Sequence, residues 1–193
     1  MASKLGIINA ALGFLGEPPL TNLSEGNKLV KVAEIYYDIS RDAALKALPW
    51  NFAIKRAELT QDVTAPVFEF QFRYQLPADC LTVLYTDDDI WSRETGQRWP
   101  YKVEGRFLVT DLSAVKIKYI ARVTEEGNFD ASFVVAFACY LAYMMAMSMT
   151  EHRNQANDLY ALFKDKVSEA RHLESQEGTP DPPIDGGWLA SRA

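Results

Sequence analysis

Apolar residues recur at a spacing of three to four positions in four stretches of the chain, and this periodicity predicts four helices. The predicted ranges are about 4–15, 25–48, 130–149 and 154–175. Boundary residues support these ranges: Ser3 and Asp130 can cap a helix, and Gly16 is typical of a helix end. Between the second and third helices, over about residues 52–123, the period falls to two, which is typical of strands.

The clearest alternation in the chain is VFEFQFRYQL, residues 67–76. It predicts one strand with an aromatic face, formed by Phe68, Phe70, Phe72, Tyr74 and Leu76. YKVEGRFLV predicts a hairpin that turns at Glu104-Gly105, and VKIKYIARV predicts a strand with Lys116 and Lys118 on its outer face. The sequence therefore predicts an α+β fold: a bundle of about four helices with an inserted antiparallel β-meander, in a single domain over residues 1–178.

The stretch RDAALKALPWNFAIKRAEL, residues 41–59, changes from a helical pattern to a strand pattern. Pro49 has no amide hydrogen and disfavours a helical backbone at the preceding residue, so the helix is expected to end near Leu48. Trp50 and Phe52 follow at once, with no catalytic residue type beside them. Because large aromatic side chains are usually buried, we interpret Pro49, Trp50 and Phe52 as a structural corner between helix and strand.

The third predicted helix is the most apolar segment of the chain. From Phe133 to Met147 its polar groups are the hydroxyls of Tyr140 and Tyr143 and the thiol of Cys139. A membrane span needs about 20 apolar residues, and this run is shorter. We therefore expect a buried core helix and no membrane insertion.

Composition narrows the classes of function. The 193 residues are 48% hydrophobic and 24% charged, which is typical of a globular chain. The net charge of −6 argues against a protein that grips nucleic acid through its phosphates. The first residues lack the pattern of a signal peptide, and Cys80 and Cys139 are expected to be free thiols in a reducing cytosol.

Motifs for catalysis or cofactor binding are absent from the sequence, which has no phosphate loop, HExxH, GxSxG or calcium loop. The polar surroundings of His152 and His172 predict solvated positions rather than a metal site. Carboxylate pairs for glycoside hydrolysis could be drawn from Glu58, Glu69, Asp79 and Glu94, but nothing in the sequence fixes their separation. The sequence therefore predicts no catalytic residue, no cofactor and no metal.

The last fifteen residues read TPDPPIDGGWLASRA. Three prolines and two glycines predict an extended C-terminal arm, residues 179–193, rather than a helix. The arm carries Ile184, Trp188 and Leu189, and tryptophan is an efficient anchor in protein interfaces. We expect it to dock on another subunit or protein; a frayed chain end is the alternative.

The order of these elements resembles the tail tubular protein A family of short-tailed phages, the head-to-tail adaptors beneath the portal. The resemblance covers most of the chain, and it continues through YQLPADCLTVL (74–84) and KVEGRFL (102–108). It is sharpest around the corner, at Ala33, Tyr36, Arg41, Leu45, Pro49, Trp50, Phe52 and Ala53. The helical pair after Asp130 is a more general match, and the arm matches in composition.

The resemblance implies a structural virion protein, in which twelve copies form a ring between the portal and a nozzle protein of the tail tubular protein B type. Double-stranded DNA would pass through the ring during ejection without being held tightly. The portal would be the favoured partner of the arm, with a neighbouring subunit as the alternative. The protein would be found in the host cytoplasm during assembly and in the virion tail afterwards. Some members of the family are credited with hydrolysis of peptidoglycan or capsular polysaccharide, so a glycoside hydrolase is the rival interpretation.

Overall fold

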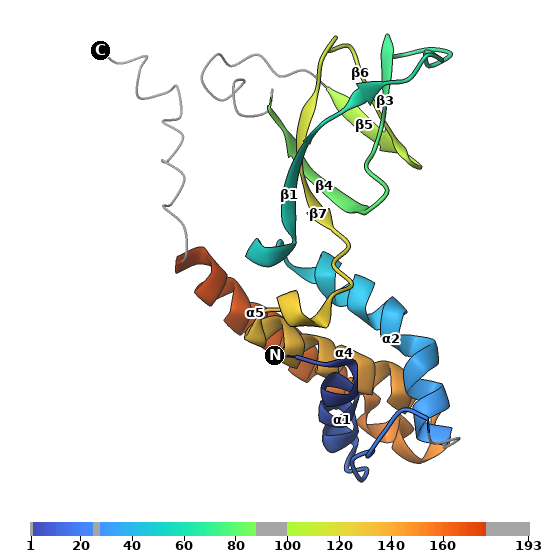
Figure 1. The fold of residues 1–193 in the computed structure, drawn as a ribbon, viewed down its shortest axis with the longest axis vertical. Coiled ribbons are helices and arrows are strands. Elements are labelled where there is room, and N and C mark those ends of the chain that lie inside the picture. The colour runs from blue at the N-terminus through green and yellow to red at the C-terminus, as the bar shows by residue number, and fades with distance from the viewer. Residues whose placement is uncertain (1, 25–27, 88–99, 177–193) are drawn as a thin grey trace. The chain divides into compact units, whose positions relative to one another are not determined.

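The computed structural model describes residues 2–24, 28–87 and 100–176, and its course is drawn in Figure 1. In this part of the chain, four α-helices are combined with two antiparallel sheets, which confirms the predicted α+β fold. The arm and the start of the second predicted helix, residues 25–27, lie outside the described residues.

The four helices are α1 (Lys4–Leu15), α2 (Lys28–Ala47), α4 (Ala131–Ser148) and α5 (Ala156–Gln176). The expected boundary residues act at their ends. The Ser3 hydroxyl accepts a hydrogen bond from the amide of Gly6 at 3.1 Å, and the Asp130 carboxylate accepts one from the amide of Ser132 at 2.7 Å. Gly16 ends α1 in the left-handed region, with φ of 77°, which glycine adopts without steric cost.

The chain divides into two compact units, which we call the helical unit and the β unit. The helical unit comprises Met1–Lys55, Asp79–Thr82 and Tyr119–Glu174. The β unit comprises Arg56–Ala78 and Val83–Lys118, together with Ser175–Ala193, most of which lies outside the described residues. The strands β1, β4 and β7 therefore have residues in both units.

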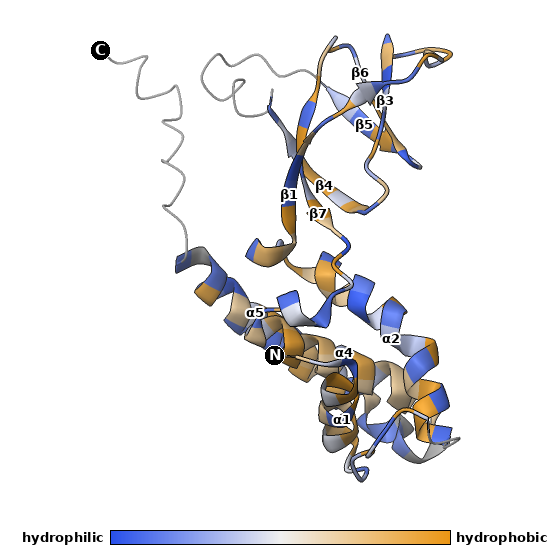
Figure 2. Ribbon diagram, viewed as in Figure 1, coloured by the Kyte–Doolittle hydropathy of each residue, from blue (hydrophilic) through white to orange (hydrophobic). Residues whose placement is uncertain are grey.

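The core of the helical unit is built around α4, which packs against both α1 and α2. Figure 2 shows hydrophobic residues predominating along α4, whereas α2 alternates between hydrophobic and hydrophilic positions. By length and composition α4 is the one described helix that could cross a membrane, a test that buried core helices also pass. Half of its residues are buried within the protein, as expected for a core helix.

Seven strands form the two sheets. One has the order β1 (Ile54–Glu58), β7 (Lys116–Ala121), β4 (Cys80–Thr86). The other has the order β2 (Thr60–Gln61), β3 (Phe72–Gln75), β6 (Phe107–Thr110), β5 (Tyr101–Glu104). The pairs β2–β3 and β5–β6 join consecutive strands of their sheet, but β3 pairs with β6, from Phe72↔Thr110 to Gln75↔Phe107. This sheet is therefore not a simple meander. After β3 the chain forms β4 in the other sheet, and it then returns to form β5 and β6.

The long strand predicted over residues 67–76 is shorter in the structure, where β3 covers only Phe72–Gln75. Glu69 has φ of 73°, a left-handed conformation that interrupts an extended strand. Its carboxylate pairs with Lys102, a contact from another strand that local alternation does not reveal. Phe70, Tyr74 and Leu76 are buried as predicted, but Phe68 is 79% exposed, so its placement on a buried face was wrong.

The prediction of a solvated His152 was also wrong. His152 lies in a short 3-10 segment, η3 (Thr150–Gln155), between α4 and α5. Its side chain is only 13% exposed, and its Nε2 atom lies 2.8 Å from Oε1 of Glu17. The two residues are 135 positions apart, so the polar sequence around His152 gave no sign of this partner. His172 is exposed as expected.

Candidate functional site

The corner predicted at Pro49, Trp50 and Phe52 is an aromatic cluster of the helical unit. Pro49 is exposed, whereas Trp50 is fully buried and its ring edge meets Phe133 of α4, with centroids 5.2 Å apart. Phe52, in the 3-10 turn η1 (Asn51–Ala53), meets Phe133 at 5.1 Å and Phe129 at 6.0 Å. Packing of this kind holds the corner between α2 and β1 rigid and supplies no reactive group.

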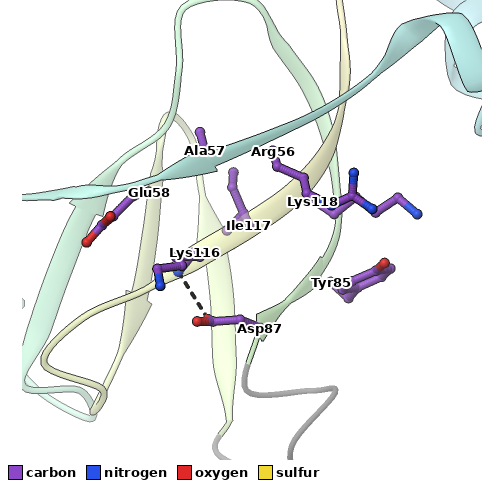
Figure 3. Close-up of a pocket in the computed structure, with 8 residues that line it drawn as sticks. All are labelled: Arg56, Ala57, Glu58, Tyr85, Asp87, Lys116, Ile117 and Lys118. Atoms are coloured by element: carbon purple, nitrogen blue, oxygen red, sulfur yellow. Dashed lines mark hydrogen bonds between the residues drawn. The ribbon is translucent and has the colours of Figure 1, made fainter.

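A concave pocket of about 370 Å³ lies in the β unit, and we call it the sheet pocket (Figure 3). It is lined by residues 56–58 of β1, by Tyr85 and Asp87 at the end of β4, and by residues 116–118 of β7. The amide of Leu59 donates to the carbonyl of Val115 at 2.9 Å, which keeps β1 and β7 together just beyond this point. Its volume is in the range of small ligand sites.

Three cationic side chains line the sheet pocket, namely Arg56, Lys116 and Lys118. Among the described residues, no carboxylate lies within ion-pair distance of any of them. The ammonium of Lys118 lies 5.2 Å from the centroid of the Tyr85 ring, a cation–π contact. The amide of Lys116 donates to Oδ1 of Asp87 at 3.1 Å, so this carboxylate is engaged by the main chain.

The charges of the sheet pocket are unevenly distributed. Figure 3 shows the side chains of Arg56 and Lys118 extending to one side of the pocket, with Tyr85 on that side, while Glu58 lies on the opposite side. Guanidinium and ammonium groups are the usual partners of carboxylates and phosphates. The described lining residues include no histidine, cysteine, serine or threonine. The arrangement of the cations is suited to holding an anionic group.

A second surface is the connection between β2 and β3, residues 62–71, which we call the apolar loop. Val63, Val67 and Phe68 are 103%, 98% and 79% exposed. The loop is nevertheless anchored at both ends: Asp62 pairs with Arg73 at 2.8 Å, and the amide of Gln71 donates to Asp111 at 2.9 Å. Large apolar side chains held in water by a fixed loop are typical of protein interfaces.

The helical unit has an exposed apolar stripe as well. Ile35 and Ile39 are 63% and 56% exposed, and their spacing of four residues places them one above the other on α2. The buried residues of α2, such as Ala33 and Tyr37, lie on its other side. Each compact unit therefore has its own exposed hydrophobic surface.

The carboxylates considered for hydrolysis are largely engaged in other contacts. Glu69 pairs with Lys102, and Asp79 accepts from Lys55 at 2.8 Å and from the Tyr119 hydroxyl at 3.1 Å. Partial burial opposes ionisation of Asp79, but these two donors outweigh it and lower its pKa below the ordinary value. Asp79 is therefore a poor general acid at neutral pH. Glu58 lines the sheet pocket, and Glu94 lies outside the described residues.

Groups that could hold a metal ion do not occur among the described residues. Cys139 is buried and Cys80 is half-buried, and neither forms a disulfide. Ile184, Trp188 and Leu189 of the arm lie outside the part of the chain that the structure describes.

Two of the surfaces described above could not be expected from the sequence pattern. Lys116 and Lys118 were expected on the outer face of their strand, but nothing indicated that Arg56 and Tyr85 join them, since the three segments meet only through sheet pairing. The exposure of Val63 and Val67 was also missed. The run DVTAP, residues 62–66, contains Val63 and directly precedes Val67; its turn-forming residues were the available signal.

In comparisons with known proteins, no family model matches the chain, and no curated protein matches it either.

Proposed function

We propose that this chain is a structural protein of a short-tailed phage virion, a head-to-tail adaptor that forms a ring between portal and nozzle. The proposal starts from the resemblance in sequence at the corner and through residues 74–84 and 102–108. The partners of each subunit in the ring are further copies of the same chain, the portal above it and the nozzle protein below it. Twelve copies are the number that the resemblance implies.

The observation that carries the proposal is the pair of exposed apolar surfaces, one on each compact unit. The apolar loop presents Val63, Val67 and Phe68, and α2 presents Ile35 and Ile39. An adaptor subunit has to contact two neighbours in the ring and different proteins at its two ends, so it needs several separate adhesive surfaces. A hydrolase instead needs convergent acid and base groups.

The decisive experiment is electron microscopy of virions that carry an affinity label on this protein. We expect the label in the tail, between head and nozzle, and we expect isolated tails to contain a ring of this chain. A second measurement uses lysates in which the gene is inactivated: filled heads and separate nozzles should accumulate without being joined. Labelled protein that is found only free in the lysate, with normal virions lacking it, would rule the proposal out.

Passage of DNA is a further part of the proposal, and the charge of the chain supports it. The net charge of −6 disfavours tight contact with phosphates, so DNA can move through without being held. In roughly 150 mM salt, we expect duplex affinity no better than the non-specific range, about 10⁻⁴ to 10⁻⁶ M. Nanomolar binding in a fluorescence anisotropy assay would contradict this expectation.

A further inference from the structure

The cations of the sheet pocket differ from the other described cations of the β unit. Outside the pocket, each is engaged: Arg73 with Asp62, Lys102 with Glu69, and Arg106 with the carbonyl of Pro77. Within it, Arg56 and the side chain of Lys116 have no such partner among the described residues, and Lys118 contacts only the Tyr85 ring. Among the described cations of the β unit, those without a carboxylate or carbonyl partner therefore lie together in the sheet pocket.

The character of the pocket favours a peptide over a nucleic acid. Duplex DNA carries a negative charge about every 1.7 Å along its axis, and Glu58 and Asp87 would repel part of such a polyanion. An extended peptide carries isolated carboxylates with apolar groups between them. The half-buried Tyr85 and Ala57 offer apolar surface beside the cations, which suits that alternation.

A segment with this chemistry occurs in the chain itself. In the arm, residues 179–187 contain Asp181 and Asp185 and no lysine or arginine, and Ile184, Trp188 and Leu189 supply apolar anchors. From Gln176, the last residue of α5, Trp188 is twelve positions away. Fully stretched, twelve residues span about 40 Å, which is enough to reach an adjoining molecule.

From this complementarity we propose that the sheet pocket binds the acidic arm of a second copy of this chain. Asp181 or Asp185 pairs with Arg56 and Lys118, and the apolar residues of the arm pack beside Tyr85. The inference rests on the proposed ring, since an arm that each copy lends to the next joins copies head to tail, and such contacts form a ring when the rotation between copies closes. It selects the neighbouring subunit, rather than the portal, as the partner of the arm.

The direct test uses a fluorescent synthetic peptide with the sequence of residues 179–193. The receptor is the full-length chain with Asp181→Lys and Asp185→Lys, which we call the arm variant, because its own arm no longer competes for the pocket. We expect saturable binding that weakens as salt is added. Adding Arg56→Gln and Lys118→Gln to the receptor should weaken binding at least tenfold, and these neutral side chains give the lysines of the receptor's own arm no new partner. As a control, Lys164→Gln with Arg171→Gln, on the exposed side of α5, makes the same change in net charge and should leave binding unchanged.

The second test measures self-association of full-length chains by sedimentation velocity. The arm variant and the pocket variant (Arg56→Glu with Lys118→Glu) should each assemble at least tenfold more weakly than the wild type. A chain with all four substitutions should recover assembly, because both charges of each pair are reversed. An equal mixture of the two variants should also recover it, which a merely misfolded variant cannot do.

Each outcome either supports or overturns the inference. Equal peptide binding by the receptor with and without the pocket substitutions would overturn it, and so would a four-substitution chain that fails to assemble. Binding of a 20-base-pair duplex that the pocket substitutions abolish would identify nucleic acid as the occupant instead. Rings in virions built from the pocket variant would leave the proposed function intact and remove only this inference. Virions without this protein would remove the proposed function, while the peptide measurement would still decide the pocket.

Discussion

The indole nitrogen of Trp50 donates a hydrogen bond to the carbonyl oxygen of Ala44 at 3.0 Å, and both residues are fully buried. Ala44 lies in the last turn of α2, where helix carbonyls commonly need partners from outside the helix. Trp50, which follows α2 in the chain, therefore donates a hydrogen bond to a backbone carbonyl at the end of that helix.

Replacing Trp50 separates its packing from its hydrogen bond. Trp50→Ala should lower the free energy of unfolding by about 3–5 kcal/mol, as is usual for a large buried aromatic. Trp50→Phe keeps an aromatic ring but removes the hydrogen bond of the indole to the buried carbonyl of Ala44, so it should cost about 1–3 kcal/mol. Urea unfolding of both variants measures these values. A Trp50→Phe variant as stable as the wild type would show that the hydrogen bond contributes nothing.

Asp42 lies between two guanidinium groups and provides a second test of stability. Its Oδ1 atom accepts from Arg41 at 2.9 Å, and its Oδ2 atom accepts from Arg122 at 2.8 Å. The Arg41 side chain is only 8% exposed, so Asp42→Ala removes a charged partner from a buried cation. We expect a loss of about 1.5–3 kcal/mol in unfolding free energy.

Asp38 is the matched control for this prediction. It also pairs with Arg41, at 2.8 Å, but its side chain is 76% exposed to solvent. Asp38→Ala should therefore cost no more than about 1 kcal/mol, as for other surface pairs. Equal losses for the two variants in urea would show that burial of the pair makes no difference.

Asp79 should make the stability of the protein depend on acidity. Hydrogen bonds from Lys55 and Tyr119 lower the pKa of Asp79 in the folded state, against the opposing effect of burial. Its contribution is present above the unfolded pKa, about 3.9, and is lost as the pH falls through the lower folded value. The stability difference between the wild type and Asp79→Asn should thus be constant from pH 5 to pH 8 and shrink below about pH 4. Urea midpoints across that range would measure it.

Tyr119 should make the stability of the protein depend on pH in the alkaline range. Burial, followed by the adjacent charge of Asp79, raises the pKa of Tyr119 to about 12. Stability from the protonated hydroxyl is complete below the unfolded pKa, about 10, and is lost as the pH rises toward 12. Tyr119→Phe should remove this alkaline loss. An unchanged pH profile in the variant would assign the loss to other tyrosines.

The two cysteines should differ in their reactivity toward thiol reagents. Burial raises the pKa of the Cys139 thiol to about 11, so almost no thiolate is present at pH 8. Cys80 is half-buried and should react first in the native protein. Cys139 should react only after denaturant is added, and Cys80→Ser should abolish the native phase. Two thiols that titrate together without denaturant would contradict the buried position of Cys139.

Helices and their ends could be predicted from the sequence because local signals determine them. Ser3, Gly16 and Asp130 act within a few residues of their own positions, so the bounds of α1 were predicted to the residue. The burial of Trp50 was predictable for a similar reason, since Pro49 stops the helix just before a large aromatic.

Features that depend on distant partners could not be predicted in the same way. Residues 68–76 alternate between apolar and polar side chains, yet β3 covers only Phe72–Gln75, Glu69 is left-handed and Phe68 is exposed. The contacts of this segment, such as Glu69 with Lys102, are made with residues far away in the sequence. The sheet pocket brings together segments from three strands, and the sequence contains no sign of that register. The position of such a site depends on how the strands pair in the sheet, which the periodicity of the sequence does not reveal.

The course of the chain between the two units has a consequence for how such a protein can change. The chain leaves the helical unit along β1, returns to it for Asp79–Thr82, leaves again along β4 and returns finally along β7. The β unit is therefore made of two inserted segments, 56–78 and 83–118, and exchanging it as a whole would cut the chain at each of these crossings. A change of length in a surface loop within either segment leaves every crossing intact. We therefore expect diversity to accumulate in the loops of the β unit while the α1–α2–α4–α5 framework stays the same.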